Sequence, residues 1–556
     1  MFDNSKPNII FLTDHTDPVF MQKCLGASKV AHELRLAGYE VLVINHLHIF
    51  SVDELLRILE KTLSNQTLFV GISNFFYKDL ENAVKETNGA IYYPFCQPGT
   101  ILPHSNALNQ HFKEYIKHLN PNCKLVLGGP NGTDAPWNKD FDYVICGYGD
   151  LSTVNLANHL TSGEQLKKAH KSLYGPIIIN DAKAEGFDIS TATMSYAPHD
   201  IVLPGETLTI EISRGCIFNC AFCSYPLNGK KKLDFIREEE ILYQEFLDNY
   251  EKYQITRYIF SDDTFNDSVD KVQMIHRISQ RLPFTLEYWA YIRLDLIAAH
   301  PSTADLLIES GLRGCFFGIE SMNKATGEII GKGANKDRLI DTLYYLKNKW
   351  KNKVMLHGSF IIGLPEETVV SVTDTYNTLM QDDFPLDSWI FVAYFLEDVS
   401  EKSNQFLSQI SANPKKYGYR IAEKKKHLLV WENDHMDFNK ASELADHFNY
   451  TGKLAGRLKL HGLASFNIAS LGFDLEFSTN KKIVELDWFT VTERKKQRAI
   501  EYKTKLFKIL NMDLDSITMY TPSPDDLILK PTWGFWWKNE IPAQDSKIKQ
   551  ATLCKV

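Results

Sequence analysis

The sequence predicts an α/β protein with two successive parallel sheets and a C-terminal region of mixed, partly helical character. Two series of short, nearly all-apolar runs alternate with stretches in which apolar residues recur at helical spacing. Such runs are typical of strands buried on both faces of a parallel sheet. The alternation stops near residue 400. We therefore expect domains at residues 1–165 and 206–400, a connector at 166–205 and a C-terminal domain at 401–556.

The first series predicts a doubly wound, Rossmann-like domain. Residues 27–37 and 52–63 have the pattern of its helices, and a ligand in such a domain lies at the carboxyl ends of the strands. Residues 171–205 have few periodic signals and contain Pro198 and Pro204, as expected of a connector. The expected strands are residues 8–12, 40–44, 67–72, 124–127 and 143–146.

The second series predicts six β/α units. In β/α barrels the reactive residues lie at the C-terminal ends of the strands, so polar residues directly after these runs are the first candidates for a functional site. The expected strands are residues 207–212, 257–260, 285–292, 314–319, 354–362 and 389–395.

Three cysteines follow the first strand of the second series. Cys216, Cys220 and Cys223 form a C-x3-C-x2-C pattern, which supplies three thiolates where a [4Fe–4S] cluster takes four ligands. One iron is then open to chelate the amino and carboxylate groups of S-adenosylmethionine (SAM). A structural zinc site usually needs a fourth nearby Cys or His, and none follows at finger spacing. The pattern therefore favours an open-iron cluster.

Composition limits the compartment and the partners. The chain has 9 cysteines in 556 residues and starts without a charged and then apolar leader segment, which favours a reduced, cytoplasmic protein over a disulfide-bonded one. A net charge of −8 gives no bulk attraction to nucleic acid or anionic membranes. Local basic patches can still attract nucleic acid, so the prediction does not exclude it as a partner. No apolar stretch approaches the roughly 20 residues that span a bilayer.

The cysteine pattern, with Phe222 before its last cysteine and the strand 207–212 before its first, resembles the radical SAM superfamily. The resemblance implies a partial (β/α)6 barrel of the TIM type, a [4Fe–4S] cluster and SAM. It also implies an electron donor such as flavodoxin or ferredoxin. In this family one electron cleaves SAM and releases a 5′-deoxyadenosyl radical, with Phe222 in the SAM-binding loop.

Two motifs at the next strand ends are similar to the family's SAM-binding positions. Asp262 and Asp263, in Ser261-Asp-Asp-Thr-Phe, are candidates to accept hydrogen bonds from the SAM ammonium. A helix cap is the alternative for these carboxylates. Arg293 offers a cation for the SAM carboxylate, and the alternative is an ion pair with Asp295.

The fourth and fifth strands of the series end in two further motifs of this kind. Glu320 and Ser321, in Gly318-Ile-Glu-Ser, match the position that binds the SAM ribose. Ile361 and Gly363 belong to a Gly-x-Pro-type turn that packs beside adenine in similar enzymes. The five motifs occur in family order.

The N-terminal series is similar to the cobalamin-binding domain that precedes the radical SAM core in one large subfamily. The likeness lies in residues 27–41, 125–131 and 142–150. Glycines allow a close backbone approach to a flat corrin or its nucleotide tail, since they lack Cβ. A simple turn out of each strand is the alternative. The candidate cobalamin contacts in these strand ends are Ser73, Asn74, Gly128, Gly129 and Gly147.

The first loop departs from one known cobalamin pattern. It begins Asp14-His-Thr-Asp and lacks Asp-x-His-x-x-Gly, the motif that places a His below cobalt. Many radical SAM relatives lack this His, so cobalamin stays in the prediction with Asp14, His15 and Thr16 near the metal. A substrate-docking module is the alternative use of the domain.

Two features lie beyond residue 400. Residues 492–510 are rich in Lys and Arg, and we expect the solvated face of a helix whose Ile500, Phe507 and Leu510 face the core, rather than a phosphate site. Trp533, Trp536 and Trp537 favour a core position over a substrate-stacking wall.

The resemblance predicts a radical SAM enzyme, with a cobalamin-dependent methyltransferase acting on an unactivated carbon as the leading function. The alternative is a radical cyclisation, oxidation or rearrangement without methyl transfer, with or without cobalamin. A non-catalytic iron–sulfur sensor ranks third. The sequence does not identify the catalytic residues, the substrate or the oligomeric state.

Overall fold

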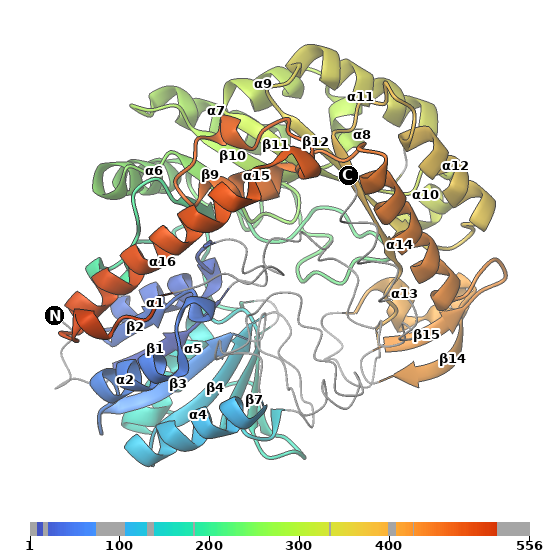
Figure 1. Cartoon of the computed structure of the whole chain (residues 1–556). Coiled ribbons are helices and arrows are strands. Elements are labelled where there is room, and N and C mark those ends of the chain that lie inside the picture. The colour runs from blue at the N-terminus through green and yellow to red at the C-terminus, as the bar shows by residue number, and fades with distance from the viewer. Residues whose placement is uncertain are drawn as a thin grey trace, which may run out of the picture.

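The computed structural model describes residues 8–14, 21–73, 106–129, 138–181, 184–332, 335–397, 407–425 and 428–519 (Figure 1). His15, Thr16, Asn74 and the three C-terminal tryptophans named above lie outside the described residues. The described part forms two sheet-based bodies that are joined by their loops and by C-terminal helices.

The N-terminal body is a doubly wound sheet, as the sequence predicts. Its strand order is β2-β1-β3-β4-β5-β7-β6, and β1 to β5 and β7 pair in parallel. Helices α1 and α5 cover one face, whereas α2 and α4 cover the other. The elements are β1 (Asn8–Leu12), α1 (Leu25–Leu36), β2 (Glu40–Ile44), η1 (Leu47–Ile49), α2 (Val52–Thr62), β3 (Thr67–Ser73), α4 (Asn106–Leu119), β4 (Lys124–Gly129), β5 (Tyr143–Gly147), α5 (Asp150–Ser162), β6 (Ala169–Lys171) and β7 (Ile177–Asp181).

The start of the expected connector belongs to this sheet. β7 pairs in parallel with β5, and β6 adds an antiparallel edge. The Ile177-Ile-Ile run supplies the buried surface of an inner strand. The strand ends in Asn and Asp, so its apolar run is too short to stand out as a strand in the sequence. β6 is three mostly exposed residues, which gives no periodic signal. The expectation of a plain connector was therefore wrong for residues 169–181.

The second body is an open, six-stranded parallel sheet in the order β13-β12-β11-β10-β9-β8. No pairing joins β8 to β13 among the described residues, so the expected partial barrel is present without closure. Its elements are η3 (Pro198–Asp200), β8 (Thr207–Ile210), α6 (Glu239–Tyr253), β9 (Arg257–Phe260), α7 (Val269–Arg281), β10 (Glu287–Ile292), α8 (Leu294–Ala299), α9 (Thr303–Glu309), β11 (Leu312–Glu320), α10 (Lys324–Ile330), α11 (Lys336–Trp350), β12 (Met355–Ile362), α12 (Val369–Leu379) and β13 (Ser388–Ala393).

The C-terminal elements pack on both bodies. α14 lies on β13, while α15 lies against β8 to β12 on the inner side of the open barrel (Figure 1). α16 runs from there to the N-terminal sheet, where it joins the core formed with α2 and α4. These elements are α13 (Gln409–Ala412), η5 (Pro414–Tyr417), β14 (Arg420–Lys425), β15 (Leu428–Glu432), α14 (Phe438–Leu454), α15 (Gly462–Ala469), η6 (Leu475–Phe477), η7 (Ile483–Glu485), α16 (Trp488–Ile509) and η8 (Leu514–Ser516).

α16 confirms the expected helix but corrects the expected role of its cations. Phe507 and Leu510 are buried as predicted. Lys495, Arg498 and Lys503 are buried too, although the basic residues were expected in solvent. Arg498 donates to the carbonyl of Pro204 (2.8 Å), and Lys503 pairs with Glu54 at 2.7 Å. Long basic side chains bury their stems and place their heads on fixed oxygens.

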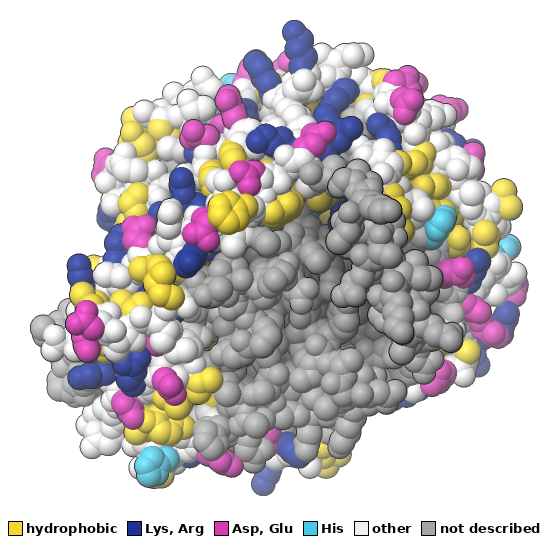
Figure 2. Space-filling view, viewed as in Figure 1, with side chains coloured by type: hydrophobic (Ala, Val, Ile, Leu, Met, Phe, Trp, Pro, Cys, Tyr) yellow, Lys and Arg dark blue, Asp and Glu magenta, His cyan; other side chains and the backbone are white. Residues whose placement is uncertain are grey.

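No helix among the described residues is long and apolar enough to cross a bilayer. On the face shown in Figure 2, basic and acidic side chains are interspersed over the described surface.

Candidate cluster and SAM site

The carboxyl ends of the two parallel sheets face each other. Gln22, in the loop after β1, donates to Thr209 on β8 at 2.8 Å. Asp150, after β5, accepts two hydrogen bonds from the Arg214 guanidinium, after β8, at 2.8 and 2.9 Å. Because ligands bind at these ends in both kinds of fold, the facing loops form one combined site region.

A buried ion network joins the two sheets next to the cysteine triplet, and we call it the interdomain clasp: Lys29, Asp150, Glu211 and Arg214. Arg214 also contacts Glu211 (2.7 Å), and Glu211 accepts a hydrogen bond from Lys29 of α1. Burial alone would raise the pKa of Glu211, but the two cations lower it to about 2. The clasp therefore holds the loop before Cys216 in a fixed position against the N-terminal sheet.

Each thiol of the triplet contacts a polar partner. Cys216 Sγ lies 3.4 Å from Thr264 Oγ1, and the Arg293 guanidinium donates to Cys220 Sγ at 3.4 Å. Asn228 Nδ2 donates to Cys223 Sγ at 3.1 Å. Donors of this kind stabilise a thiolate and tune a bound cluster.

The backbone of the triplet loop is fixed by a buried lysine and by a glycine. Lys230 Nζ donates to the carbonyls of Arg214 (2.8 Å) and Asp234 (2.9 Å). Gly215 has φ +70°, and a Cβ there would lie 2.5 Å from the backbone oxygen of Leu227. Lys230 is thus a structural cation, which the sequence did not reveal.

The donor set fits an iron–sulfur cluster better than a single metal ion. No group of three His, Cys, Asp or Glu side chains within the described ranges is arranged to hold one ion. In a [4Fe–4S] cluster each thiolate binds a different iron, so the sulfur atoms stand farther apart than the ligands of one ion. Burial raises the pKa of Cys216 and raises that of Cys223 to about 11, so both groups are protonated without a ligand, and a cluster would have to displace their protons.

The two adjacent carboxylates after β9 have different surroundings. Asp262 is buried, accepts from the backbone N–H of Ile212 (3.1 Å) and the hydroxyl of Ser213, and lies 3.4 Å from Lys271. The carboxylate of Asp263 has no hydrogen bond or ion pair with any described residue and is half-buried. Burial and the charge of Asp262 raise the pKa of Asp263 to about 7. Asp263 is the carboxylate left for a ligand.

Arg293 lies between the cysteine loop and Asp295. Its guanidinium pairs with both oxygens of Asp295, at 3.0 and 2.5 Å, and stacks 3.8 Å from the centre of the Phe218 ring. Its third nitrogen, Nη1, donates to Cys220 Sγ. The ion pair with Asp295, which the sequence analysis gave as an alternative, is therefore present. The same guanidinium also contacts the triplet at Cys220.

Glu320 is the last residue of β11 and Ser321 follows it, and the two side chains make different contacts. Glu320 has φ +65° and lies 3.9 Å from Lys332, and burial raises the pKa of its carboxyl. A left-handed conformation at a non-glycine residue is strained and is often found at functional sites. Ser321 donates to Glu367 (2.7 Å), whose other oxygen accepts from the Gly363 N–H at 2.9 Å. Ser321 thus links β11 to the turn after β12.

Gly363 is required by its surroundings. It has φ +93°, and a Cβ there would lie 2.2 Å from the indole of Trp431. Its carbonyl accepts from Tyr419 at 2.7 Å. Ile361 is half-buried and packs on the barrel core, as does Phe222. The turn that the family resemblance assigns to adenine is therefore rigid.

The floor of the open barrel is a row of paired side chains on neighbouring strands, which the sequence analysis did not single out. Tyr291, Phe316, His357 and Ser388 are opposite each other on β10 to β13. His357 Nδ1 lies 2.8 Å from Ser388 Oγ, and burial lowers the pKa of His357 well below its usual range. The inner face thus offers aromatic rings and a neutral imidazole below the strand ends.

The N-terminal strand ends hold the described cobalamin candidates. Asp14 accepts from the backbone N–H of His48 (2.7 Å) and contacts its Nδ1 (2.6 Å), so its carboxylate is occupied. Gly129 and Gly147 have φ +129° and +102° at the ends of neighbouring strands. A Cβ on Gly128 would meet nothing closer than 4.0 Å. Ser73 ends β3 at the same edge.

Glycines with positive φ at two neighbouring strand ends fit a flat ligand that approaches the backbone. Sequence reasoning missed several residues that surround the triplet and the strand ends, namely the clasp, Lys230, Glu367 and the barrel floor. Of these, Arg214 and Glu211 were visible as charges beside the triplet, but their partners lie far away in the chain.

The comparison with family models decides the assignment of the second body. Residues 210–379 match the radical SAM superfamily. The chain carries a radical SAM domain. Its matched range contains the triplet and the motifs after β9, β10, β11 and β12. A domain of this superfamily implies a [4Fe–4S] cluster and SAM as cofactors.

Curated relatives cover the radical SAM domain and part of its flanks. An uncharacterized methyltransferase of Pyrococcus horikoshii is 30% identical over 280 residues, which are 47% of this chain and 58% of the relative. The anaerobic magnesium-protoporphyrin IX monomethyl ester cyclase of Rubrivivax gelatinosus is 21% identical over 50% of this chain and 52% of the relative. The chain thus spans little more than half the length of these relatives.

Solved structures show the same fold for both bodies together. The cobalamin-dependent SAM radical enzyme OxsB with aqua-cobalamin bound has a TM-score of 0.56 at 14% identity, covering 94% of this chain and 82% of that one. The radical SAM methyltransferase TsrM of Kitasatospora setae, with cobalamin and a [4Fe–4S] cluster bound, has a TM-score of 0.54 at 14% identity, covering 76% and 79%. The radical SAM domain and the N-terminal sheet therefore share an architecture with cobalamin-dependent enzymes.

Proposed function

We propose that this chain is a cobalamin-dependent radical SAM methyltransferase that acts on an unactivated carbon. The observation that carries the proposal is the arrangement of the two sheets, whose carboxyl ends face each other across Asp150 and Arg214. A ligand on the N-terminal sheet and SAM on the barrel would then share one chamber. The relative from Pyrococcus horikoshii and TsrM, both named as methyltransferases, support the same reaction.

On the barrel side, Cys216, Cys220 and Cys223 would hold the cluster. Among the adjacent carboxylates we assign the SAM ammonium to Asp263, because Asp262 is already engaged with the protein. The Arg293 guanidinium already donates to Asp295 and to Cys220 Sγ. We therefore assign Arg293 mainly to the cluster ligand Cys220 rather than to the SAM carboxylate.

The SAM nucleoside would lie along the ends of β11 and β12. Glu320 is the candidate for the ribose hydroxyls, and its left-handed backbone is a strain of the kind found at functional sites. The turn with Ile361 and Gly363 would contact adenine. Ser321 acts through Glu367, which fixes the Gly363 N–H, and is therefore a positioning residue.

On the N-terminal side, Gly129 and Gly147 would allow the corrin or its tail to approach the strand ends, with Ser73 and Gly128 at the same edge. Asp14 is tied to His48, so we assign it to holding the loop after β2 rather than to cobalt. Asn74, His15 and Thr16 stay as sequence-based candidates.

When bound, the cluster with SAM supplies a carbon-centred radical reagent, and cobalamin supplies a transferable methyl group. The protein orients these groups and keeps water out. The clasp fixes the distance between the two halves, and the row at the barrel floor with α15 closes the chamber from below.

The first test is anaerobic reconstitution with iron, sulfide and hydroxocobalamin, followed by desalting and visible spectroscopy. We expect an iron–sulfur absorbance and retained cobalamin near one equivalent per chain. With SAM and dithionite we expect both 5′-deoxyadenosine and S-adenosylhomocysteine, the product left when SAM gives up its methyl group. Retention of no cobalamin, or no S-adenosylhomocysteine, would overturn the methyltransferase proposal.

A second candidate function is a radical cyclisation or oxidation, favoured by the relative from Rubrivivax gelatinosus, which is named as a cyclase. The same reaction mixture separates the two, because a cyclase forms 5′-deoxyadenosine without S-adenosylhomocysteine. Once a substrate is found, the mass of the product decides: methylation adds one CH2 unit, whereas cyclisation removes hydrogen.

A further inference from the structure

The backbone of the cysteine loop makes contacts outside the clasp. Two segments make these contacts. The N–H of Ala221 donates to the carbonyl of Ile330 at 3.1 Å, at the end of α10. The N–H of Ile410, in α13, donates to the carbonyl of Ala221 at 3.0 Å, and Gln409 Nε2 donates to the carbonyl of Asn219 at 3.0 Å. The loop backbone around Cys220 is therefore clamped between α10 and α13.

Cys220 is itself buried, but two residues close to it reach the surface. Asn219, its neighbour in the chain, is exposed, and so is Gly331. A Cβ added to Gly331 would lie 3.9 Å from the Cα of Cys220. Because electron transfer slows steeply with distance, these two residues offer a short route from solvent to the triplet.

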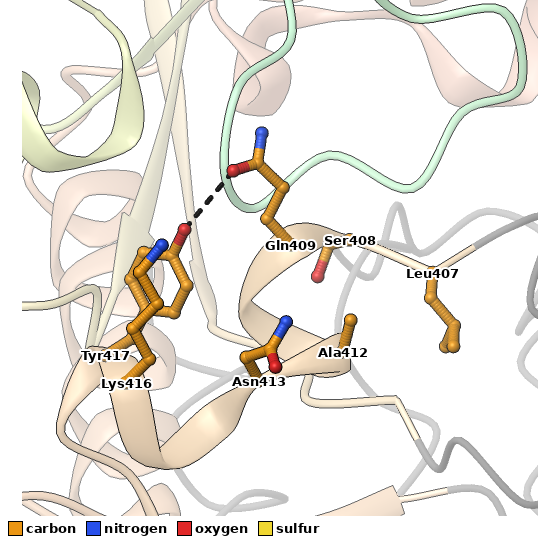
Figure 3. A pocket seen from close by; sticks show the side chains of 7 residues that line it. All are labelled: Leu407, Ser408, Gln409, Ala412, Asn413, Lys416 and Tyr417. Atoms are coloured by element: carbon orange, nitrogen blue, oxygen red, sulfur yellow. Dashed lines mark hydrogen bonds between the residues drawn. The ribbon is translucent and has the colours of Figure 1, made fainter.

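A pocket of about 370 Å³ opens next to this route, lined by residues 407–409, 412–413 and 416–417 (Figure 3). Gln409 connects the pocket to the cysteine loop, because its Oε1 accepts from the Tyr417 hydroxyl (3.3 Å) while its Nε2 reaches Asn219. Lys416 lines the pocket beside Tyr417.

The charge of this surface is opposite to that of the whole chain. Lys415 and Lys416 are exposed, and neither forms an ion pair with a carboxylate among the described residues. The chain has a net charge of −8. Lys416, which lines the pocket with Gln409, and its chain neighbour Lys415 therefore form a local positive patch on an acidic protein.

We infer that this surface, the outer face (Asn219, Gly331, Gln409, Asn413, Lys415 and Lys416), docks an acidic, low-potential one-electron carrier protein. The inference rests on the proposed function, because a cluster at the triplet requires an external electron. In the step the carrier is oxidised by one electron and the cluster is reduced by the same electron, with no transfer of a proton or group. Electron-transfer proteins associate through small interfaces, and complementary charges guide the approach. A small basic surface is therefore suited to an acidic carrier.

The side opposite the outer face is less accessible to a carrier. There Arg293 points at Cys220 from β10, and the clasp ties the loop to the N-terminal sheet. Asp263, which we assign to SAM, does not line the pocket of the outer face. A carrier on the outer face would thus deliver its electron without displacing SAM or substrate.

The binding test uses oxidised flavodoxin, titrated by calorimetry into the full-length protein at low ionic strength. The variant is Lys415→Glu/Lys416→Glu, and the matched control is Lys167→Glu/Lys171→Glu, which makes the same charge change on exposed residues at the far edge of the N-terminal sheet. We expect about tenfold weaker binding for the first variant, no change for the control, and a smaller difference at high salt. Equal Kd values for the three proteins would overturn the inference.

The kinetic test compares two reductants on the reconstituted enzyme with SAM. With reduced flavodoxin, the KM for flavodoxin should rise about tenfold in Lys415→Glu/Lys416→Glu, whereas 5′-deoxyadenosine formation with dithionite should stay unchanged. If dithionite also fails to produce 5′-deoxyadenosine in the wild type, the proposed function is wrong and the calorimetric result alone decides the docking surface. An unchanged KM for flavodoxin with intact dithionite activity would reject the outer face.

Discussion

Removing Asp150 from the interdomain clasp should destabilise the protein by about 3 kcal/mol. The Asp150 and Arg214 side chains are each 4% exposed and form two hydrogen bonds of 2.8 and 2.9 Å. Breaking a buried pair by deleting one partner costs roughly 3–5 kcal/mol, because the other charge stays buried. In Asp150→Ala, Glu211 still balances one of the two remaining cations, so the lower end of this range applies.

The assay is urea-induced unfolding of the protein without cofactors, followed by tryptophan fluorescence and circular dichroism. The matched control is Glu185→Ala, which removes an ion pair with Lys168 at 2.6 Å whose side chains are 64% and 44% exposed. An exposed pair contributes roughly 0–1 kcal/mol. A double-mutant cycle with Arg214→Ala should give a coupling free energy well above that of the control pair.

The clasp also predicts a dependence on pH. The folded pKa of Glu211 is about 2, below its ordinary value of 4.5, so its contribution is complete above pH 4.5 and is lost as the pH falls toward 2. The difference corresponds to about 3 kcal/mol. The reasoning is refuted if Asp150→Ala costs no more than the exposed control, or if Glu211→Gln leaves the acid unfolding midpoint unchanged.

The remaining predictions concern the barrel side of the site. Gly363→Ala should cost about 3 kcal/mol, since it combines a positive φ with an added Cβ 2.2 Å from an indole carbon; Gly418→Ala, with φ +82° and no atom within 4 Å, should cost about 1 kcal/mol in the same thermal-unfolding series. Asp263 has a folded pKa of about 7, above its ordinary 3.8, so its stabilising effect is complete below pH 3.8 and lost as the pH rises through 7. Because the side chain is half-buried, Asp263→Asn should be more stable than the wild type by about 2 kcal/mol at pH 8 and equal at pH 4, and equal stabilities at pH 8 would contradict this. Cys220→Ala should lose the iron–sulfur absorbance and SAM cleavage, while Cys315→Ala, a buried cysteine within β11, should keep both; SAM cleavage by the first variant would exclude the triplet as the cluster site.

The sequence predicted the strands well because burial on both faces leaves a strong apolar signal. β1 and β2 have the expected bounds, and the barrel strands differ from expectation by a few residues at their ends. The failures have a local cause. β6 is short and exposed at an edge, and its Ala-His-Lys sequence carries no pattern of a strand.

The site could be predicted only as far as its residues lie in local motifs. The triplet and the residues after each barrel strand are contiguous in sequence, and the parallel sheet brings them to one edge. Which member of a motif is available depends on distant partners: Asp262 is occupied by Lys271 and the loop after β8, and Asp263 is not. Asp150, which pairs with Arg214, and Glu54, which pairs with Lys503, lie in other parts of the chain, so no spacing rule finds them.

The position of α15 and α16 sets the order in which the chain can finish folding during synthesis. Thr207 on β8 donates to the carbonyl of Phe466, 259 residues later, and the backbone of Asn45 donates to Tyr502, 457 residues later. Until the ribosome has released these helices, the inner side of the barrel lacks α15, and the core that α2 and α4 form on the N-terminal sheet lacks α16. Long-range closure of this kind is slow and leaves apolar surface exposed in the nascent chain. The protein should therefore depend on chaperones late in translation, and cluster insertion should follow the release of its last helices.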